Sequence, residues 1–263
     1  KLNNLGHTIF SCIEIKNALN IKNFQYWYLV NFDDFFFKNS TRFLDVYKKL
    51  TDFRSKKEFI KILSYKVAGN EKSLIFNKEN IHNQYFPEFL KLDEKKILID
   101  VGAYDGDTIK NFLSRNQKFK KIVAFEPDEF NFKILQENFK NNNKVSIHNF
   151  ALGSNNKLVN FHSSQDKSKI DKNGDHRIFV RTLDSLKLIP DFIKVDIEGS
   201  EEDFILGSKK TILRYKPQIA ICVYHKSNDF YNLVDLILSI NNKYKLYFRH
   251  HSFGFTESVM YFI

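Results

Sequence analysis

Acidic residues crowd a glycine-containing turn in the stretch DVGAYDGDT (100–108) of this 263-residue sequence. An apolar run ends at Asp100, two glycines follow four residues apart, and Asp105 and Asp107 precede an expected helix. A helix start after a strand and a glycine turn presents backbone N–H groups that usually favour anions such as phosphate. The carboxylates of Asp105 and Asp107 would repel an anion at this position. The stretch therefore predicts a site for a small molecule that carries positive charge and lacks phosphate.

A further carboxylate follows the next apolar run. The stretch AFEPD (124–128) places Glu126 at the end of a second expected strand, where its oxygens can accept hydrogen bonds from both hydroxyls of a ribose. S-adenosylmethionine fits both observations, because it combines a ribose with a sulfonium and an ammonium group and has no phosphate. Glu126 by itself would also suit NAD, but the glycine turn lacks the third glycine of the dinucleotide-binding motif.

A second group of ionisable residues follows a later apolar run. We expect that strand to end near Asp196, which places Asp196 and Glu198 at the sheet edge where ligands bind. Lys194 and Asp196 are costly to bury in an apolar strand unless they are paired, and this favours a functional role over a surface one. His225 closes the next apolar run and His250 lies in the run 244–252, so both are expected on the same edge.

The elements that would position these residues form a regular series from about residue 96 onward. Short apolar runs alternate with segments of helical spacing, several of which begin with a capping residue. Repeated strand–helix–strand units predict an α/β fold with a doubly wound, mostly parallel sheet. The expected strands are 95–102, 120–127, 144–151, 191–199 and 217–225, and the expected helices are 108–119, 129–140, 201–215 and 228–240, with Asp107, Asp128 and Ser200 as caps.

Other parts of the chain depart from this series. Residues 151–191 contain two strand-like runs around a polar loop. The last two apolar runs, 244–252 and 256–263, are joined by a short link, which favours an antiparallel hairpin because a parallel return needs about a dozen residues. Residues 1–95 carry aromatic clusters and helical spacing at 41–65. We therefore expect a mainly helical N-terminal cap or dimerisation region (1–95) before a cofactor-binding domain (96–263).

Composition narrows the class of protein. The formal charge of +10 suggests an anionic partner, but the bias toward Lys, Asn, Ile and Phe runs through the whole chain, so no nucleic-acid partner is expected. Cys12 and Cys222 form no disulfide framework, which favours a reducing, cytoplasmic location. No apolar run approaches the roughly 20 residues of a membrane span, so no integral membrane association is expected. The sequence begins with Lys1, which suggests part of a longer protein.

Several stretches along the chain carry a combined resemblance. They are DVGAYDGDT (100–108), FEPD (125–128), NFALGS (149–154), IKVDIEGSE (193–201) and LYFRHHS with ESVMYF (246–262), together with QYF (84–86). Together these stretches resemble the FkbM family of S-adenosylmethionine-dependent O-methyltransferases, which have the class I methyltransferase fold. The resemblance covers roughly residues 80–263. It implies a seven-stranded sheet in which the C-terminal hairpin inserts one antiparallel strand.

The resemblance also implies a cofactor site. Asp100, Gly102 and Gly106 would surround the methionine part of S-adenosylmethionine, and Glu126 would hold the ribose. Asn149 and Ala151, at the end of the third strand, would lie near the adenine, and Tyr85 would close over the cofactor. The remaining residues of the same implied site are Ala103, Tyr104, Asp107, Thr108, Pro127 and Asp196.

The implied reaction is methyl transfer to a hydroxyl. A neutral sugar hydroxyl is a poor nucleophile, so a general base within hydrogen-bond reach contributes about 10²–10⁴ in rate. We predict His225 as that base, with a substrate-orienting role as the alternative. Asp196, Glu198 and His250 complete the predicted catalytic group, and His251 lies beside it. The same group offers ligands for a divalent metal ion, but no paired metal-binding spacing is present and we predict no metal.

The acceptor is the least determined feature. Members of the family commonly methylate sugars or natural products, so we predict a small molecule: a sugar, a nucleotide-activated sugar or a surface-glycan precursor. Lys167, Lys169, Lys172 and Arg177 are candidates to meet its phosphates. Two other classes remain open. One is an NAD-dependent oxidoreductase or epimerase, which would share Glu126, and the other is a non-catalytic basic binding module. A homodimer through the aromatic N-terminal region is a further possibility.

Overall fold

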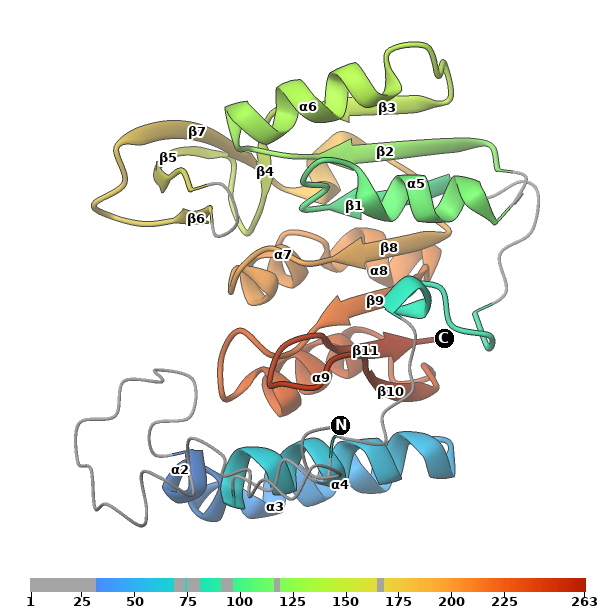
Figure 1. Cartoon of the computed structure of the whole chain (residues 1–263), viewed down its shortest axis with the longest axis vertical. Helices are drawn as coiled ribbons and strands as arrows, with labels where there is room; N and C mark the ends of the chain where they lie inside the picture. The colour runs from blue at the N-terminus through green and yellow to red at the C-terminus, as the bar shows by residue number, and fades with distance from the viewer. Residues whose placement is uncertain (1–31, 69–73, 75–80, 91–96, 116–118, 165–167) are drawn as a thin grey trace, which may run out of the picture.

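A seven-stranded sheet forms the centre of the molecule (Figure 1). The computed structural model describes residues 32–68, 74, 81–90, 97–115, 119–164 and 168–263. The strand order is β10-β11-β9-β8-β1-β2-β3, and β11 is antiparallel to both of its neighbours while the remaining pairs are parallel. This confirms the predicted sheet and hairpin. The strands are β1 (Ile97–Val101), β2 (Lys121–Phe125), β3 (Val145–His148), β8 (Phe192–Val195), β9 (Gln218–Cys222), β10 (Leu246–His250) and β11 (Ser258–Phe262).

Both faces of the sheet are buried, which explains why its strands are apolar almost throughout. Successive side chains of a strand point to opposite faces. In β1, Ile99 and Val101 therefore join one hydrophobic cluster, while Leu98 joins the other. Asp100 and Lys194 are buried charged residues at the centre of the sheet, where they face each other in the register of β1 and β8.

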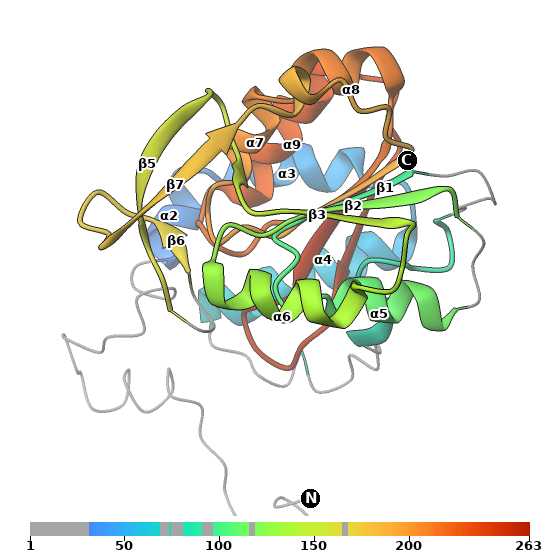
Figure 2. The ribbon, with the colours of Figure 1, turned by 90° about the horizontal axis from the view of Figure 1, so that it is seen from above.

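Helices cover the two faces of the sheet (Figure 2). Helices α5 (Asp107–Ser114) and α6 (Glu129–Phe139) pack on one face, and α7 (Glu201–Leu206), α8 (Lys209–Tyr215) and α9 (Asp229–Ile240) pack on the other. Asp128 caps α6 as predicted, because its carboxylate accepts from the backbone N–H groups of Phe130 and Asn131. Helix α5 ends at Ser114 rather than at the predicted residue 119.

The single helix predicted over 201–215 is two helices in the structure. The carbonyl of Gly207, between α7 and α8, accepts a hydrogen bond from the backbone of Asp184 in the 3-10 helix η4 (Leu183–Leu186). The Asp184 carboxylate in turn accepts from the backbone of Lys210 and Thr211 at the start of α8. A segment distant in sequence therefore interrupts the helix, and local spacing could not predict this.

The described N-terminal helices pack on the β10 end of the sheet. They are α2 (Phe32–Lys38), α3 (Ser40–Lys49) and α4 (Phe53–Ala68), and α3 and α4 take the place of the single predicted helix at 41–65. Their buried aromatic residues, such as Phe43 and Phe59, share one hydrophobic cluster with α9 and β10. The aromatic stretch that precedes Phe32 lies outside the described residues, and so does Cys12. A domain boundary at residue 95 and dimerisation stay predictions.

A smaller, four-stranded sheet lies beside the carboxyl ends of the central strands (Figure 1). Its long strands pair antiparallel and correspond to the two strand-like runs expected between residues 151 and 191. Its order is β4-β7-β5-β6, with β4 (Ala151–Leu152), β5 (Lys157–His162), β6 (Lys169–Ile170) and β7 (His176–Arg181).

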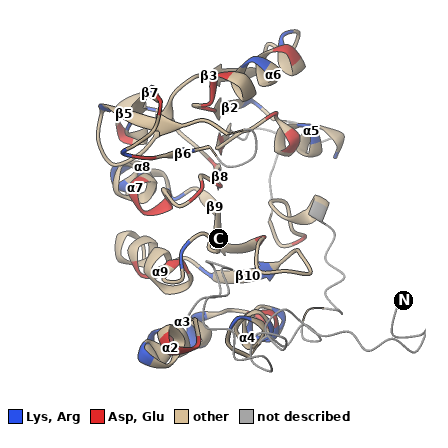
Figure 3. Ribbon diagram, turned by 60° about the vertical axis from the view of Figure 1, so that its left-hand side comes forward, with Lys and Arg blue, Asp and Glu red and all other residues tan. Residues whose placement is uncertain are grey.

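Charged residues are spread over the described elements. Lys and Arg positions occur beside Asp and Glu positions on the outer helices, including α2, α3, α4 and α6 (Figure 3). This distribution agrees with the chain-wide bias expected from composition. In the described part of the chain, no helix has both the length and the apolar character needed to cross a membrane.

Candidate active site

A cavity of about 850 Å³ lies at the carboxyl ends of β1, β2 and β8, next to the smaller sheet. This is the edge at which doubly wound sheets bind ligands. The described residues of α2, α3 and α4 do not line it. Of the cofactor-binding and catalytic residues predicted from the sequence, those that line it are Tyr85, Gly102, Tyr104, Asp107, Thr108, Glu126, Pro127, Ala151, Asp196 and Glu198.

The glycine turn brings backbone close to this cavity. Gly102 and Gly106 have φ angles of 77° and 88°, a region that residues with a Cβ rarely adopt. A Cβ on Gly102 would lie 1.9 Å from the backbone oxygen of Asp196, so β1 and the segment after β8 approach as closely as two backbones can. Gly106 packs against α6 and does not line the cavity. The first glycine therefore shapes the cavity, and the second fits the turn to the helix behind it.

Glu126 is held at the cavity wall by backbone donors. Its Oε2 accepts from the N–H of Tyr104 at 2.8 Å, and its Oε1 accepts from the N–H of Asp128 at 2.9 Å. Burial raises the pKa of Glu126 to about 7, although these two bonds oppose the shift. A carboxylate with fixed orientation and unusual proton affinity thus lies where the sequence predicted a ribose-binding acid.

Asp100 and Lys194 form a fully buried ion pair beneath the cavity. Asp100 Oδ1 lies 3.1 Å from Lys194 Nζ, and the two side chains are 0% and 4% exposed. Burial raises the pKa of Asp100 to about 6, with Lys194 opposing this shift. Lys194 also donates to the carbonyl of Gly102. Asp100 does not line the cavity, so its observed contact is with the lysine that fixes the glycine turn.

Asp196 is the most constrained carboxylate of the reacting end. Its Oδ2 accepts from the hydroxyl of Tyr85 at 2.8 Å, and its Oδ1 lies 3.5 Å from Nε2 of His225. Burial acts to raise the pKa of Asp196, but Lys194, His225 and the Tyr85 hydrogen bond outweigh it, so the pKa lies below its ordinary value. The lowered pKa makes Asp196 a poor proton acceptor.

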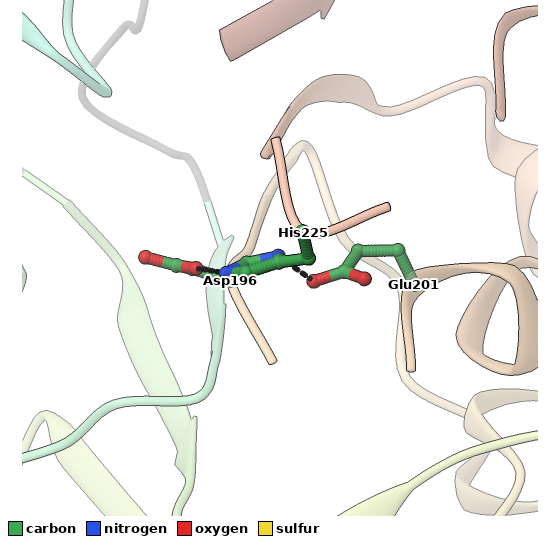
Figure 4. Close-up of side chains that lie close together, drawn as sticks. All are labelled: Asp196, Glu201 and His225. Atoms are coloured by element: carbon green, nitrogen blue, oxygen red, sulfur yellow. Dashed lines mark ion pairs between the residues drawn. The ribbon is translucent and has the colours of Figure 1, made fainter. Parts of the chain in front are cut away.

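His225 lies between two carboxylates (Figure 4). Its Nδ1 is 2.9 Å from Oε1 of Glu201, and its Nε2 is 3.5 Å from Asp196 and 3.7 Å from Oε2 of Glu198. Burial acts to lower the pKa of His225, but the acids, Glu201 foremost, raise it to about 10. The ring is therefore protonated at neutral pH, and it does not line the cavity. This geometry favours the alternative role of orienting the site over that of general base.

The same three residues are the candidate metal ligands of the described chain. Asp196, Glu201 and His225 each offer a ligand atom within 4.8 Å of the others. The two carboxylates, however, face different nitrogens of the imidazole ring. In the observed orientation of the ring, each nitrogen therefore faces its own carboxylate. The arrangement therefore favours a buried ion pair over a metal centre.

His250 and His251 do not converge on the site, contrary to expectation. His250 is 0% exposed, its Nδ1 lies 2.9 Å from the hydroxyl of Ser258, and its backbone N–H donates to Glu58 of α4. Nε2 of His251 lies 2.9 Å from the hydroxyl of Tyr261. Neither histidine lines the cavity, because β10 is the edge strand farthest from β2 and β3 and is covered by α4.

Asn149 and Ala103 support the site from outside the cavity. The side-chain amide of Asn149 donates to the carbonyls of Glu126 and Pro127 at 3.0 and 3.2 Å. It therefore fixes the loop after β2, and Ala151 rather than Asn149 reaches the cavity. Ala103 is 0% exposed and packs in the core beneath the glycine turn.

Several polar residues of the cavity wall were not predicted from the sequence. Gln84, Tyr224 and Glu257 are among them, and they come from three separate segments. Gln84 and Glu257 are the first residues of two stretches that resemble the family, QYF and ESVMYF, but neither follows a central parallel strand, which was the signal used. The positive φ of Glu257, 64°, is visible only in the structure.

The seven-stranded sheet with its antiparallel C-terminal strand is the fold of a class I methyltransferase. A family model described as the methyltransferase FkbM domain matches residues 100–255, more than half of the chain. The chain therefore belongs to the FkbM methyltransferase family.

Two relatives show how far the similarity extends. The crystal structure of methyltransferase FkbM from Methylobacillus flagellatus KT has a TM-score of 0.79 with 26% identity, and the match covers 90% of this chain and 62% of that one. The 2-O-methyltransferase NoeI of Sinorhizobium fredii (strain NBRC 101917 / NGR234) is 25% identical over 162 residues, which are 51% of this chain and 65% of NoeI. The chain thus spans less than two thirds of either relative.

Proposed function

We propose that this protein transfers the methyl group of S-adenosylmethionine to a hydroxyl of a sugar, a nucleotide-activated sugar or a surface-glycan precursor. The observation that carries the proposal is Glu126, a backbone-fixed carboxylate at the end of β2 that lines a cavity in a chain of the FkbM family. The relative NoeI is named as a 2-O-methyltransferase, which supports oxygen as the acceptor atom.

The residues of the cavity fit this cofactor. Glu126 would accept hydrogen bonds from the ribose hydroxyls, and Pro127 and Ala151 would border the adenine. Asp107 and the ion-paired Asp196 contribute negative charge to the cavity wall. S-adenosylmethionine supplies an electrophilic methyl on a sulfonium, so carboxylates near it are favourable, whereas they would repel a pyrophosphate.

The reacting end is arranged to position an acceptor. Glu201 and His225 hold Asp196, and Asp196 holds the hydroxyl of Tyr85, so these groups are fixed before any ligand binds. Preorganised groups of this kind contribute to rate by aligning the acceptor oxygen. Carboxylates at the same end would accept hydrogen bonds from the other hydroxyls of a sugar.

The loop lysines remain candidates for phosphate binding. Lys169 lines the cavity, whereas Lys172 and Arg177 lie on exposed parts of the smaller sheet and its turn. Lys167 lies outside the described residues. A phosphorylated acceptor would therefore place its charged end near Lys169, at the mouth formed by the smaller sheet.

The NAD-dependent alternative is less well supported by the site. It shares Glu126, but the turn after β1 carries Asp107 on the cavity wall, where a pyrophosphate would have to lie. A non-catalytic binding module would need neither the buried Asp100–Lys194 pair nor the carboxylates of the reacting end.

The test is transfer of labelled methyl from S-adenosylmethionine to a panel of methyl hexopyranosides and sugar nucleotides, with products identified by mass spectrometry. We expect a gain of one methyl on oxygen in at least one sugar. At limiting S-adenosylmethionine, Glu126→Ala should form much less product, while the exposed control Glu137→Gln on α6 should form as much as wild type. Reduction or oxidation of NAD by the same sugars, without methyl transfer, would contradict the proposal.

A further inference from the structure

Glu257 lies in the loop between β10 and β11 and lines the cavity. Its φ angle is 64°. Among the described non-glycine residues with positive φ, Tyr104, Glu198 and Glu257 line the cavity, while the other two, Lys187 and Lys216, end short helices. Strained backbone persists where surrounding contacts enforce it, and such positions cluster at functional sites.

A chain of hydrogen bonds connects Glu257 to the reacting end. Gln84 Nε2 donates to Oε2 of Glu257 and also lies 3.1 Å from the hydroxyl of Tyr85, to which it donates. Tyr85 donates in turn to Asp196. One oxygen of Glu257 is thus fixed. The other accepts no hydrogen bond from a side chain or backbone group of the described residues, and Glu257 borders the cavity.

The proton affinity of Glu257 differs from that of Asp196. Burial, with Asp196 as the next contributor, raises the pKa of Glu257 above its ordinary value, and the Gln84 hydrogen bond and His225 oppose the shift. The pKa of Asp196 is shifted in the opposite direction, its Oδ2 accepts from Tyr85, and its Oδ1 faces the imidazole of His225 at 3.5 Å. A carboxylate accepts a proton best when its pKa approaches the working pH and one oxygen is available to substrate. The pKa of Glu257 is raised and one of its oxygens is available, whereas His225 is already protonated at neutral pH.

We propose that Glu257 is the general base that removes the proton of the acceptor hydroxyl. This inference rests on the proposed function. In the step, the acceptor oxygen forms a bond to the methyl carbon as the carbon–sulfur bond breaks, and the electron pair of that bond stays on sulfur. The hydroxyl proton moves to the Glu257 carboxylate and is released to water after the product leaves. Gln84 holds the carboxylate, and Tyr85 and Asp196 fix Gln84.

The first test compares wild type, Glu257→Gln, Glu257→Asp and the control Glu137→Gln. Each is titrated with S-adenosylhomocysteine and then assayed with the methyl hexopyranoside that wild type methylates fastest. We expect Glu257→Gln to bind S-adenosylhomocysteine within about threefold of wild type but to lose about 100-fold or more in kcat. Glu257→Asp should retain more activity than Glu257→Gln, because it keeps a carboxylate.

The outcomes separate this inference from the proposed function. In the first outcome, wild type binds S-adenosylhomocysteine and methylates the glycoside, and the kcat of Glu257→Gln is within threefold of the wild-type value. This result would overturn the role of Glu257 and leave the proposed function standing. Wild type that binds no S-adenosylhomocysteine would overturn the function and the inference together.

A pH profile tests whether the carboxylate acts as a base or merely supports the loop. Gln84→Leu removes a donor that favours the charged form of Glu257, so the pKa of Glu257 rises and the acid limb of the kcat profile moves to higher pH. Glu137→Gln should leave this limb unchanged. The proposal would be contradicted if the acid limb of the kcat profile of Gln84→Leu stayed at the wild-type pH while its kcat on the pH plateau equalled that of wild type.

Discussion

Oε1 of Glu201 lies 2.9 Å from Nδ1 of His225 and so fixes which ring nitrogen faces Asp196. The same oxygen accepts the backbone N–H of Ile197 at 3.1 Å. One carboxylate at the start of α7 therefore holds both the loop after β8 and the histidine after β9. The reacting end is assembled by a buried charge network, and its stability should depend on the protonation of His225.

His225→Ala should destabilise the protein in a pH-dependent way. The raised pKa of about 10 means that the ion-pair stabilisation is complete below about pH 6.5, where unfolded histidine is also protonated, and is lost as pH rises toward 10. Leaving buried acids without their cation costs about 3–5 kcal/mol. Urea unfolding at pH 6, 8 and 10 should show that the difference in free energy of unfolding between wild type and variant becomes smaller as pH rises.

The exposed His176→Ala provides the matched control for this measurement, since its ring pairs only with the exposed Asp175. A gap between wild type and His225→Ala that stays constant from pH 6 to 10 would show that the ring is not held as a cation.

Lys194→Met should leave Asp100 buried without its counter-charge. We expect a loss of about 3–5 kcal/mol in the free energy of unfolding, because removing one partner of a buried pair leaves an uncompensated charge. The double variant Asp100→Asn with Lys194→Met should recover part of this loss. A double-mutant cycle by urea unfolding measures the coupling, and strictly additive losses would contradict the pairing.

Gly102→Ala should damage the cavity more than an ordinary glycine replacement. The added Cβ would meet the backbone oxygen of Asp196 at 1.9 Å, and backbone cannot move aside as a side-chain tip can. The positive φ adds further strain. We expect a lower Tm and weakened binding of S-adenosylhomocysteine by calorimetry. Gly254→Ala, where a Cβ would meet nothing within 4 Å, is the control and should behave as wild type.

Cofactor binding should release a proton near neutral pH. Burial raises the pKa of Glu126 to about 7, so a fraction of this side chain is protonated in the ligand-free protein. Hydroxyl donors from the ribose favour the charged form and lower that pKa. Titration with S-adenosylhomocysteine at pH 7 in buffers of different ionisation enthalpy should therefore reveal proton release in wild type. Equal heats in all buffers would count against Glu126 as the ribose ligand.

Features set by local pattern could be predicted from the sequence. The apolar runs ending at Asp100 and Glu126 gave the strands and the cavity edge, and Asp128 was recognisable as a helix cap. Features that depend on contacts distant in sequence could not be predicted. The break between α7 and α8 requires Asp184, and His250 is directed to α4 by the position of β10 in the sheet.

The residues of the site also divide into those that local pattern predicts and those that depend on contacts distant in sequence. The acids that follow central strands, Glu126 and Asp196, were predicted to reach the cavity and do line it. Glu257 was missed because it follows an edge strand and reaches the cavity only through the antiparallel return of β11. The role of His225 depends on Glu201, a helix-start residue whose spacing in sequence indicates capping rather than a charge partner.

The most direct test of the account is calorimetric titration of the purified chain with S-adenosylhomocysteine and, separately, with NAD, using Glu126→Ala and Glu137→Gln as the paired variants. We predict that wild type and Glu137→Gln bind S-adenosylhomocysteine, that Glu126→Ala binds about 10- to 150-fold more weakly because it loses charged hydrogen bonds, and that NAD does not bind. Binding of NAD in place of S-adenosylhomocysteine would contradict the assignment of the cavity.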